Sequence, residues 1–216
     1  MARGIAAKLI SLAAFLFIAG CAVFPAALGR QRAYQMTAQA GWSAKLYGSQ
    51  TFDILTFQPK GPVPGDVLSI VIEGDGRAWL TKNRPSSDPT PLDPLGLRLA
   101  LKAREGIVYL ARPCQFVQGE AKRNCEPVFW TNARFAPEVL DSMNSVIDQV
   151  KEDRGATSLR LIGFSGGGTL AALLSLERSD VSQFITVASP LDIDAWAKLH
   201  RMSPLRYSLN PASRLN

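Results

Sequence analysis

One turn constrains the fold of this chain more than any other feature, the stretch LIGFSGGGTL at residues 161–170. The apolar segment SLRLIGF predicts a short buried strand, and GGTLAALLSLE after it predicts a helix. Ser165 stands at the joint in a G-x-S-x-G pattern, with Gly163 and Gly167 on either side. A strand that turns sharply into a helix holds the serine side chain out of the fold, so we expect Ser165 to be a nucleophile. The alternative is a glycine-rich turn that binds a phosphate, but no P-loop lysine follows.

The remainder of the 216 residues alternates in the same way between apolar runs and helical patterns. The expected strands are 51–58, 66–74, 106–113, 158–164 and 181–190, and the expected helices are 93–105, 136–155 and 167–177. Alternating strands and helices predict an α/β fold with a mostly parallel sheet flanked by helices. A hydrophobic content of 47% suits one globular domain of this length.

The N-terminal stretch differs from this domain. Arg3 and Lys8 precede a short apolar run that ends in IAGC at Cys21. This order is typical of a secretory signal, and the run is shorter than the ~20 residues of a transmembrane helix. The ending resembles the lipobox of bacterial lipoproteins, which implies a signal peptide at 1–20 and a lipid on Cys21. An uncleaved membrane anchor is the alternative.

The lipobox resemblance also implies a place in the cell. Ala22, not Asp, follows Cys21, which implies anchoring at the periplasmic face of the bacterial outer membrane. We interpret residues 21–45 as the lipidated cysteine and a tether, and 46–216 as the folded domain. Removal of 1–20 lowers the net charge from +6 to +4, and no block of Lys and Arg indicates a nucleic-acid partner.

Two further cysteines, Cys114 and Cys125, flank the polar stretch QFVQGEAKRN. An exported protein enters an oxidising compartment, so we expect a disulfide between them. Two free thiols or a metal site are the alternatives, and the lack of a nearby His or carboxylate cluster disfavours the metal.

The turn at Ser165 also provides hydrogen-bond donors for a tetrahedral oxyanion. The helix that follows presents the free N–H of Gly166. In such sites a second donor comes from the loop after an earlier strand, often in an H-G-x-G pattern. Here that loop reads Glu73-Gly74-Asp75-Gly76, with Glu73 in the place of His. We expect Asp75 to supply this donor ahead of its two glycine neighbours; a polar turn that caps the strand is the alternative.

Taken together, the chain resembles the α/β-hydrolase superfamily over about residues 50–215, and more closely a group of exported bacterial members. The stretches that carry the likeness are IEGDGRAW, PSSDPTPLDPLGLRLA, YLARPCQ, FWTNARFAPEV, GFSGGGTLAALL and LHRMSPLRYSLNP. The resemblance implies a serine nucleophile that acts on small-molecule or lipid esters, or on similar acyl compounds, without a cofactor.

The acid and base of such a site are the difficulty. In this family the chain order is Ser, then Asp or Glu, then His, and the resemblance implies a His beyond further strands. The one histidine here is His200. Either the domain is incomplete at its C-terminus, with 181–190 left as an open sheet edge, or His200 is the base and Asp192 or Asp194 its acid.

Two functions therefore follow. The first is a lipid-anchored serine hydrolase of the bacterial envelope. The second is a catalytically inactive lipoprotein that keeps the fold as a binding module. Four further side chains in the quoted stretches are candidates for an acyl pocket, although Arg134 is equally suited to pair with a carboxylate: Arg77, Trp79, Trp130 and Arg134.

Overall fold

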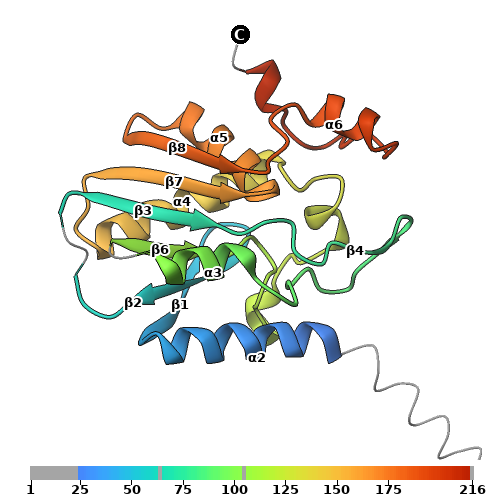
Figure 1. Cartoon of the computed structure of the whole chain (residues 1–216). Coiled ribbons are helices and arrows are strands. Elements are labelled where there is room, and N and C mark those ends of the chain that lie inside the picture. Colours follow the sequence, from blue (N-terminus) through green and yellow to red (C-terminus); the bar gives the residue numbers. More distant parts are fainter. Residues whose placement is uncertain (1–23, 63–64, 104–105, 215–216) are drawn as a thin grey trace, which may run out of the picture.

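A six-stranded sheet organises the chain (Figure 1). The computed structural model describes residues 24–62, 65–103 and 106–214. In the order of the sheet, the strands are β1 (Trp42–Gly48), β2 (Asp53–Pro59), β6 (Ile107–Leu110), β3 (Val67–Ile72), β7 (Ser158–Phe164) and β8 (Val181–Val187). The helices are α2 (Phe24–Gln39), α3 (Leu95–Lys102), α4 (Pro137–Asp153), α5 (Gly166–Glu177) and α6 (Ile193–Leu199).

The sheet is mostly parallel, as predicted. Strands β6, β3, β7 and β8 run parallel, whereas β2 is antiparallel to both β1 and β6. In the register, Ile72 lies opposite Leu110 on one side and Gly163 on the other. The parallel strands therefore end together, which brings the loops that begin at Glu73 and Ser165 to the same edge.

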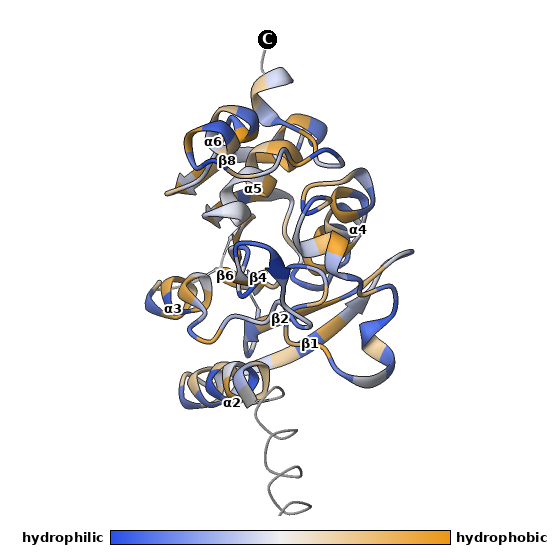
Figure 2. Cartoon of the chain, turned by 90° about the vertical axis from the view of Figure 1, so that its right-hand side faces the viewer, coloured by the Kyte–Doolittle hydropathy of each residue, from blue (hydrophilic) through white to orange (hydrophobic). Residues whose placement is uncertain are grey.

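Helices cover both faces of the sheet. Helices α4 and α5 pack on one face, and α2 and α3 pack on the other, which Figure 2 shows end-on. Alternation along β3 assigns its side chains to these layers, because Ile70 and Ile72 belong to the α4/α5 core while Val71 belongs to the α2/α3 core. Buried parallel strands are apolar on both faces for this reason.

The N-terminal part of the domain corrects the sequence interpretation. Part of the stretch 21–45, expected to be a tether, forms helix α2 and the start of β1. Ala33 is fully buried, Arg30 pairs with Asp88 at 2.9 Å, and the Tyr34 ring meets Phe57 at 5.3 Å between centroids. The sequence of this helix shows little apolar periodicity. Contacts with distant residues therefore hold the helix in place.

The signal peptide and Cys21 lie outside the described residues. Within residues 24–62, 65–103 and 106–214, none of the helices combines the length and apolar character that crossing a bilayer requires.

The expected disulfide is confirmed. Cys114 is bonded to Cys125, with 5.5 Å between their Cα atoms. The bond closes the loop after β6, which contains the 3₁₀ helix η2 (Gly119–Lys122) and leads into η3 (Pro127–Trp130).

The edge of the sheet formed by β8 is less covered than its centre. Strand β8 is the last in the sheet order, and three of its apolar side chains are exposed, Phe184, Ile185 and Val187. A small hairpin of β4 (Trp79–Thr81) and β5 (Arg84–Pro85) and a short 3₁₀ helix η4 (Pro211–Ser213) complete the described elements.

Candidate active site

Ser165 occupies the turn between β7 and α5 in a left-handed backbone conformation, with φ +52° and ψ −124°. Such angles are rare for a residue other than glycine and cost about 1–3 kcal/mol. Two hydrogen bonds hold the turn. The Ser165 N–H donates to the Val187 carbonyl at 2.9 Å, and its carbonyl accepts from the Gly168 N–H at 3.0 Å. The sharp strand–serine–helix turn expected from the sequence is present.

The glycines around Ser165 let two backbones touch. A Cβ on Gly163 would lie 2.2 Å from the Gly167 carbonyl oxygen, and one on Gly167 would lie 2.4 Å from the Ile72 carbonyl oxygen. Backbone atoms cannot yield at such distances, so only glycine fits. A Cβ on Gly166 would meet a carboxylate oxygen of Asp75 at 2.2 Å. The serine turn therefore rests directly on the loop after β3.

Ser165 and Asp75 line the same cavity, of about 420 Å³, at the carboxyl edge of the sheet. The N–H of Gly166 lies in the first turn of α5, where a helix offers no internal acceptor. Across the described parts of the chain, neither this N–H nor that of Asp75 donates a hydrogen bond. The structure thus brings together the serine and the two residues expected to bind an oxyanion.

Glu73 anchors the loop on one side. Its buried carboxylate accepts hydrogen bonds from the backbone N–H of Gly96 at 3.1 Å and of Leu97 at 3.3 Å, at the start of α3, and from the Tyr109 hydroxyl at 3.1 Å. Burial raises the pKa of Glu73, although these hydrogen bonds oppose the rise. A carboxylate thus caps a helix at the position where the H-G-x-G pattern has its histidine.

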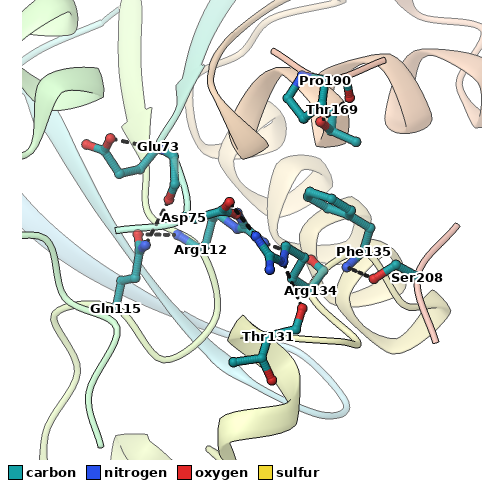
Figure 3. A network of polar contacts seen from close by, with 11 residues as sticks. Glu73, Asp75, Arg112, Gln115, Thr131, Arg134, Phe135, Thr169, Pro190 and Ser208 are labelled. Atoms are coloured by element: carbon teal, nitrogen blue, oxygen red, sulfur yellow. Dashed lines mark hydrogen bonds and ion pairs between the residues drawn. The ribbon is translucent and has the colours of Figure 1, made fainter. Parts of the chain in front are cut away.

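Asp75 anchors the other side through two buried arginines (Figure 3). One carboxylate oxygen pairs with Arg112 Nη1, and the other accepts from Arg134 Nη1 at 2.7 Å. Burial by itself would raise the pKa of Asp75, but the charges of Arg134 and Arg112 outweigh it and hold the pKa below its usual value. The side chain is fixed as an anion, and the two ion pairs hold the loop that carries the Asp75 N–H.

Sequence reasoning missed two parts of this arrangement, Arg112 and Gln115. The Gln115 amide donates to the Gly74 carbonyl at 2.9 Å and completes the bracing of the loop. The only signal for Arg112 is a charged residue near the end of the apolar run, in YLARPCQ. The alternative role considered for Arg134, pairing with a carboxylate, is confirmed.

The proposed acid and base lie elsewhere. Asp192 begins α6 and accepts from the Asp194 and Ala195 N–H groups. Asn210 Nδ2 bridges the carboxylates of Asp192 and Asp194, at 3.1 and 3.0 Å. These bonds hold the pKa of Asp192 below its usual value, with the Ala195 N–H as the main cause.

His200 ends α6, exposed, with its ring 5.1 Å from that of Trp196 between centroids. It lines a different cavity from the one that Ser165 lines. In the described ranges no hydrogen bond joins His200 to Asp192 or Asp194. The structure therefore brings the three together on one short helix, without a contact that would orient His200 toward Ser165.

In the same ranges, no group of three or more His, Cys, Asp or Glu residues is placed to hold a metal ion.

Comparison with known proteins gives structural likeness only. No protein-family model and no curated protein sequence matches the chain. An alpha-beta serine hydrolase homologue from Coxiella burnetii is 16% identical, with a TM-score of 0.46 over 75% of this chain and 70% of that one. A carboxylesterase from Bacillus subtilis is 13% identical, with a TM-score of 0.42 over 74% of this chain and 49% of that one.

A putative lipase from Acinetobacter baumannii is also 13% identical, with a TM-score of 0.45 over 74% of this chain and 46% of that one. The chain thus matches about half the length of the last two proteins. All three TM-scores are below 0.5, so the fold assignment rests on the sheet order and on the strand–serine–helix turn. On those observations the chain has an α/β-hydrolase-like fold.

Proposed function

We propose that this chain is a serine hydrolase that cleaves esters or related acyl compounds, with Ser165 as the nucleophile. One observation carries the proposal. Ser165, in a left-handed conformation at a strand–helix turn, shares a cavity with Asp75, and the N–H groups of Asp75 and Gly166 donate to no acceptor among the described residues. A turn of this strain is kept only where the surrounding fold enforces it, and such turns cluster at active sites.

The geometry supports a defined first step. Ser165 Oγ attacks the carbonyl carbon of the substrate, the C=O double bond opens, and its oxygen becomes an oxyanion. The N–H groups of Gly166 and Asp75 donate to that oxygen. The proton of the Ser165 hydroxyl passes to a general base as the new C–O bond forms.

The bracing of the loop has a catalytic purpose under this proposal. An oxyanion donor lowers the barrier only if it is already in place when charge develops, because reorganisation would consume the gain. Glu73 and the Asp75–Arg112–Arg134 cluster fix both ends of the loop that carries the second donor. Removal of one such donor typically costs about 100- to 1000-fold in turnover.

Labelling with a fluorophosphonate probe tests the nucleophile. The full chain, purified in detergent, should be labelled and should hydrolyse 4-nitrophenyl butyrate, and Ser165→Ala should lose both signals. Ser175→Ala is the matched control, because Ser175 lies on the same helix but does not line the cavity. Equal labelling of wild type and Ser165→Ala, in folded protein, would refute the proposal.

The second candidate function is a binding module without catalysis. It is favoured by the position of His200, the one histidine of the chain, on a different cavity from Ser165. His200→Gln separates the possibilities for the base. If the His200→Gln variant loses turnover, His200 is the base. If the variant keeps turnover, another group accepts the proton of Ser165. A folded wild type with neither labelling nor turnover supports the binding module.

We further propose that the protein acts at the periplasmic face of the bacterial outer membrane, anchored by a lipid on Cys21. The supporting feature is the IAGC ending of an apolar run preceded by Arg3 and Lys8. Metabolic labelling with radioactive palmitate tests it. Label on the wild type that is absent from Cys21→Ala is expected, and equal label on both would refute the anchor.

A further inference from the structure

A second, larger cavity of about 690 Å³ lies between the β4–β5 hairpin and the segment from Trp196 to Leu205. Two features connect it to the Ser165 cavity. Trp79 lines both, and Arg134, which lines the larger cavity, pairs with Asp75, which lines the smaller one. The two cavities therefore share part of their walls.

The charge of the larger cavity is one-sided. Its lining includes Lys82, Arg134 and Arg201, and no acidic residue. Behind the wall, Arg134 and Arg112 share one ion-pair partner, the carboxylate of Asp75. Lys82 and Arg201 are exposed, whereas the Arg134 side chain is 3% exposed. Such a field attracts an anion into the cavity.

Two buried donors in the wall point to the same class of ligand. Arg134 Nη2 and Trp79 Nε1 are closed to solvent and have no hydrogen-bond partner among the described residues. A buried donor without a partner is costly, and each such group in a native fold needs an explanation. Lys82 and Arg201 would meet the ligand first.

The remaining lining combines apolar and aromatic side chains, with Trp196, Met202 and Leu205 on the side of α6, and polar side chains, which are Thr81, Asn83, Asn132 and Ser203. A ligand that suits the whole cavity therefore has both an anionic oxygen group and an apolar part. We propose that this cavity binds the carboxylate or phosphate group of an amphiphilic acyl compound whose ester bond reaches Ser165 past Trp79. The substrate part of this inference rests on the proposed hydrolase function; the binding part does not.

Binding is tested on the full chain carrying Ser165→Ala, so that no result depends on hydrolysis. The probes are butyl phosphate, pentanoate and neutral 1-butanol, titrated against tryptophan fluorescence at low and high salt. The test variant adds Lys82→Gln and Arg201→Gln. The matched control adds Lys198→Gln and Arg206→Gln, which remove the same charge from exposed residues outside the cavity lining.

We expect the two anions to bind and 1-butanol to bind far more weakly. The test variant should weaken anion binding at least about fivefold, the control should not, and high salt should reduce the difference. Equal binding of anions and 1-butanol, equal weakening in both double variants, or no binding of any probe would each overturn the proposal. Preference for butyl phosphate over pentanoate identifies a phosphate ligand, and the reverse identifies a carboxylate.

A kinetic arm then separates this inference from the proposed function. With Ser165 intact, the Lys82→Gln, Arg201→Gln variant should raise KM for the mono-4-nitrophenyl ester of glutaric acid about fivefold more than it raises KM for 4-nitrophenyl butyrate. An equal rise for both esters contradicts the anion site as a substrate site. Anion binding without turnover of either ester contradicts the hydrolase and leaves the binding site standing.

Discussion

Two carboxylates, at opposite edges of the same sheet, are each held by two cations. Asp75 follows β3 at the carboxyl edge, between Arg112 and Arg134. Asp180 precedes β8 at the amino edge, between Arg178 and Lys151. The arginines at Asp75 are the more deeply buried, with side chains 5% and 3% exposed, against 9% and 25% for the cations at Asp180.

The two clusters differ in how completely they are satisfied. Arg178 also pairs with Asp148 at 2.6 Å and donates to Asn144, so two cations meet two carboxylates at the amino edge. At the carboxyl edge two arginines meet one carboxylate, and Arg134 Nη2 has no acceptor among the described residues. The amino-edge cluster joins α4, α5 and β8 and serves stability. The carboxyl-edge cluster holds a loop in place and leaves positive charge for a ligand.

Removal of the Asp75 charge should have the largest effect. In Asp75→Asn, two buried guanidinium groups lose their carboxylate, and breaking a buried ion pair costs about 3–5 kcal/mol. The free energy of unfolding, measured with urea at pH 7, should fall by this amount. A smaller loss than that of Asp180→Asn would break the comparison.

Asp180→Asn should cost less and depend on pH. Hydrogen bonds from Arg178, and then from Lys151, lower the pKa of Asp180 from 3.8 to about 2. That difference corresponds to at most about 2.5 kcal/mol at neutral pH. Because the folded pKa is depressed, the stabilisation is complete above pH 4 and is lost as the pH falls toward 2. Urea titrations at pH 7, 5, 4 and 3 should show wild type and variant converge; a constant gap would contradict the assignment.

Lys151→Met should have the smallest effect. Its pair with Asp180 is partly exposed on both sides, and such pairs contribute about 0.2–1 kcal/mol. The loss should shrink in 0.5 M NaCl, because salt screens exposed charges. A double-mutant cycle with Asp180→Asn isolates the pair. A second cycle, with Arg178→Met and Asp180→Asn, measures the coupling energy of the Arg178–Asp180 pair. We expect this energy to exceed that of the Lys151–Asp180 pair, and the opposite order would contradict the prediction.

The difference between local and distant contacts explains which parts of the structure the sequence could predict. The strand–serine–helix turn at 158–177 was predicted within a residue, because strand pattern, glycine spacing and helix pattern agree within one short segment. Helix α2 was missed because its contacts, such as Arg30 with Asp88, come from far along the chain. The disulfide was predictable because the lipobox resemblance assigns Cys21 to a lipid, which leaves one pairing among the three cysteines, Cys114 with Cys125.

The loop at Asp75 shows the limit within the candidate site. A place for Asp75 near Ser165 was expected, because its loop follows an earlier strand and glycines flank it. Its clamp was not, because Arg112 is 37 residues away in sequence and Arg134 is 59 residues away, and no local pattern links either to a loop after β3. The cap that Glu73 forms on α3 could not be predicted either, because the Gly96 N–H meets the Glu73 carboxylate only when α3 is packed on the sheet.

These separations also bear on the order in which the protein assembles. The loop that faces Ser165 depends on Arg134, which lies 59 residues after Asp75 in the sequence, and the serine turn depends on Val187, whose carbonyl accepts from the Ser165 N–H. Closing contacts across such intervals is slow compared with forming a helix or a turn. The Asp75 loop therefore reaches its final geometry only after the chain as far as Arg134 has joined the fold, and the Ser165 turn reaches its own only after β8 has joined the sheet.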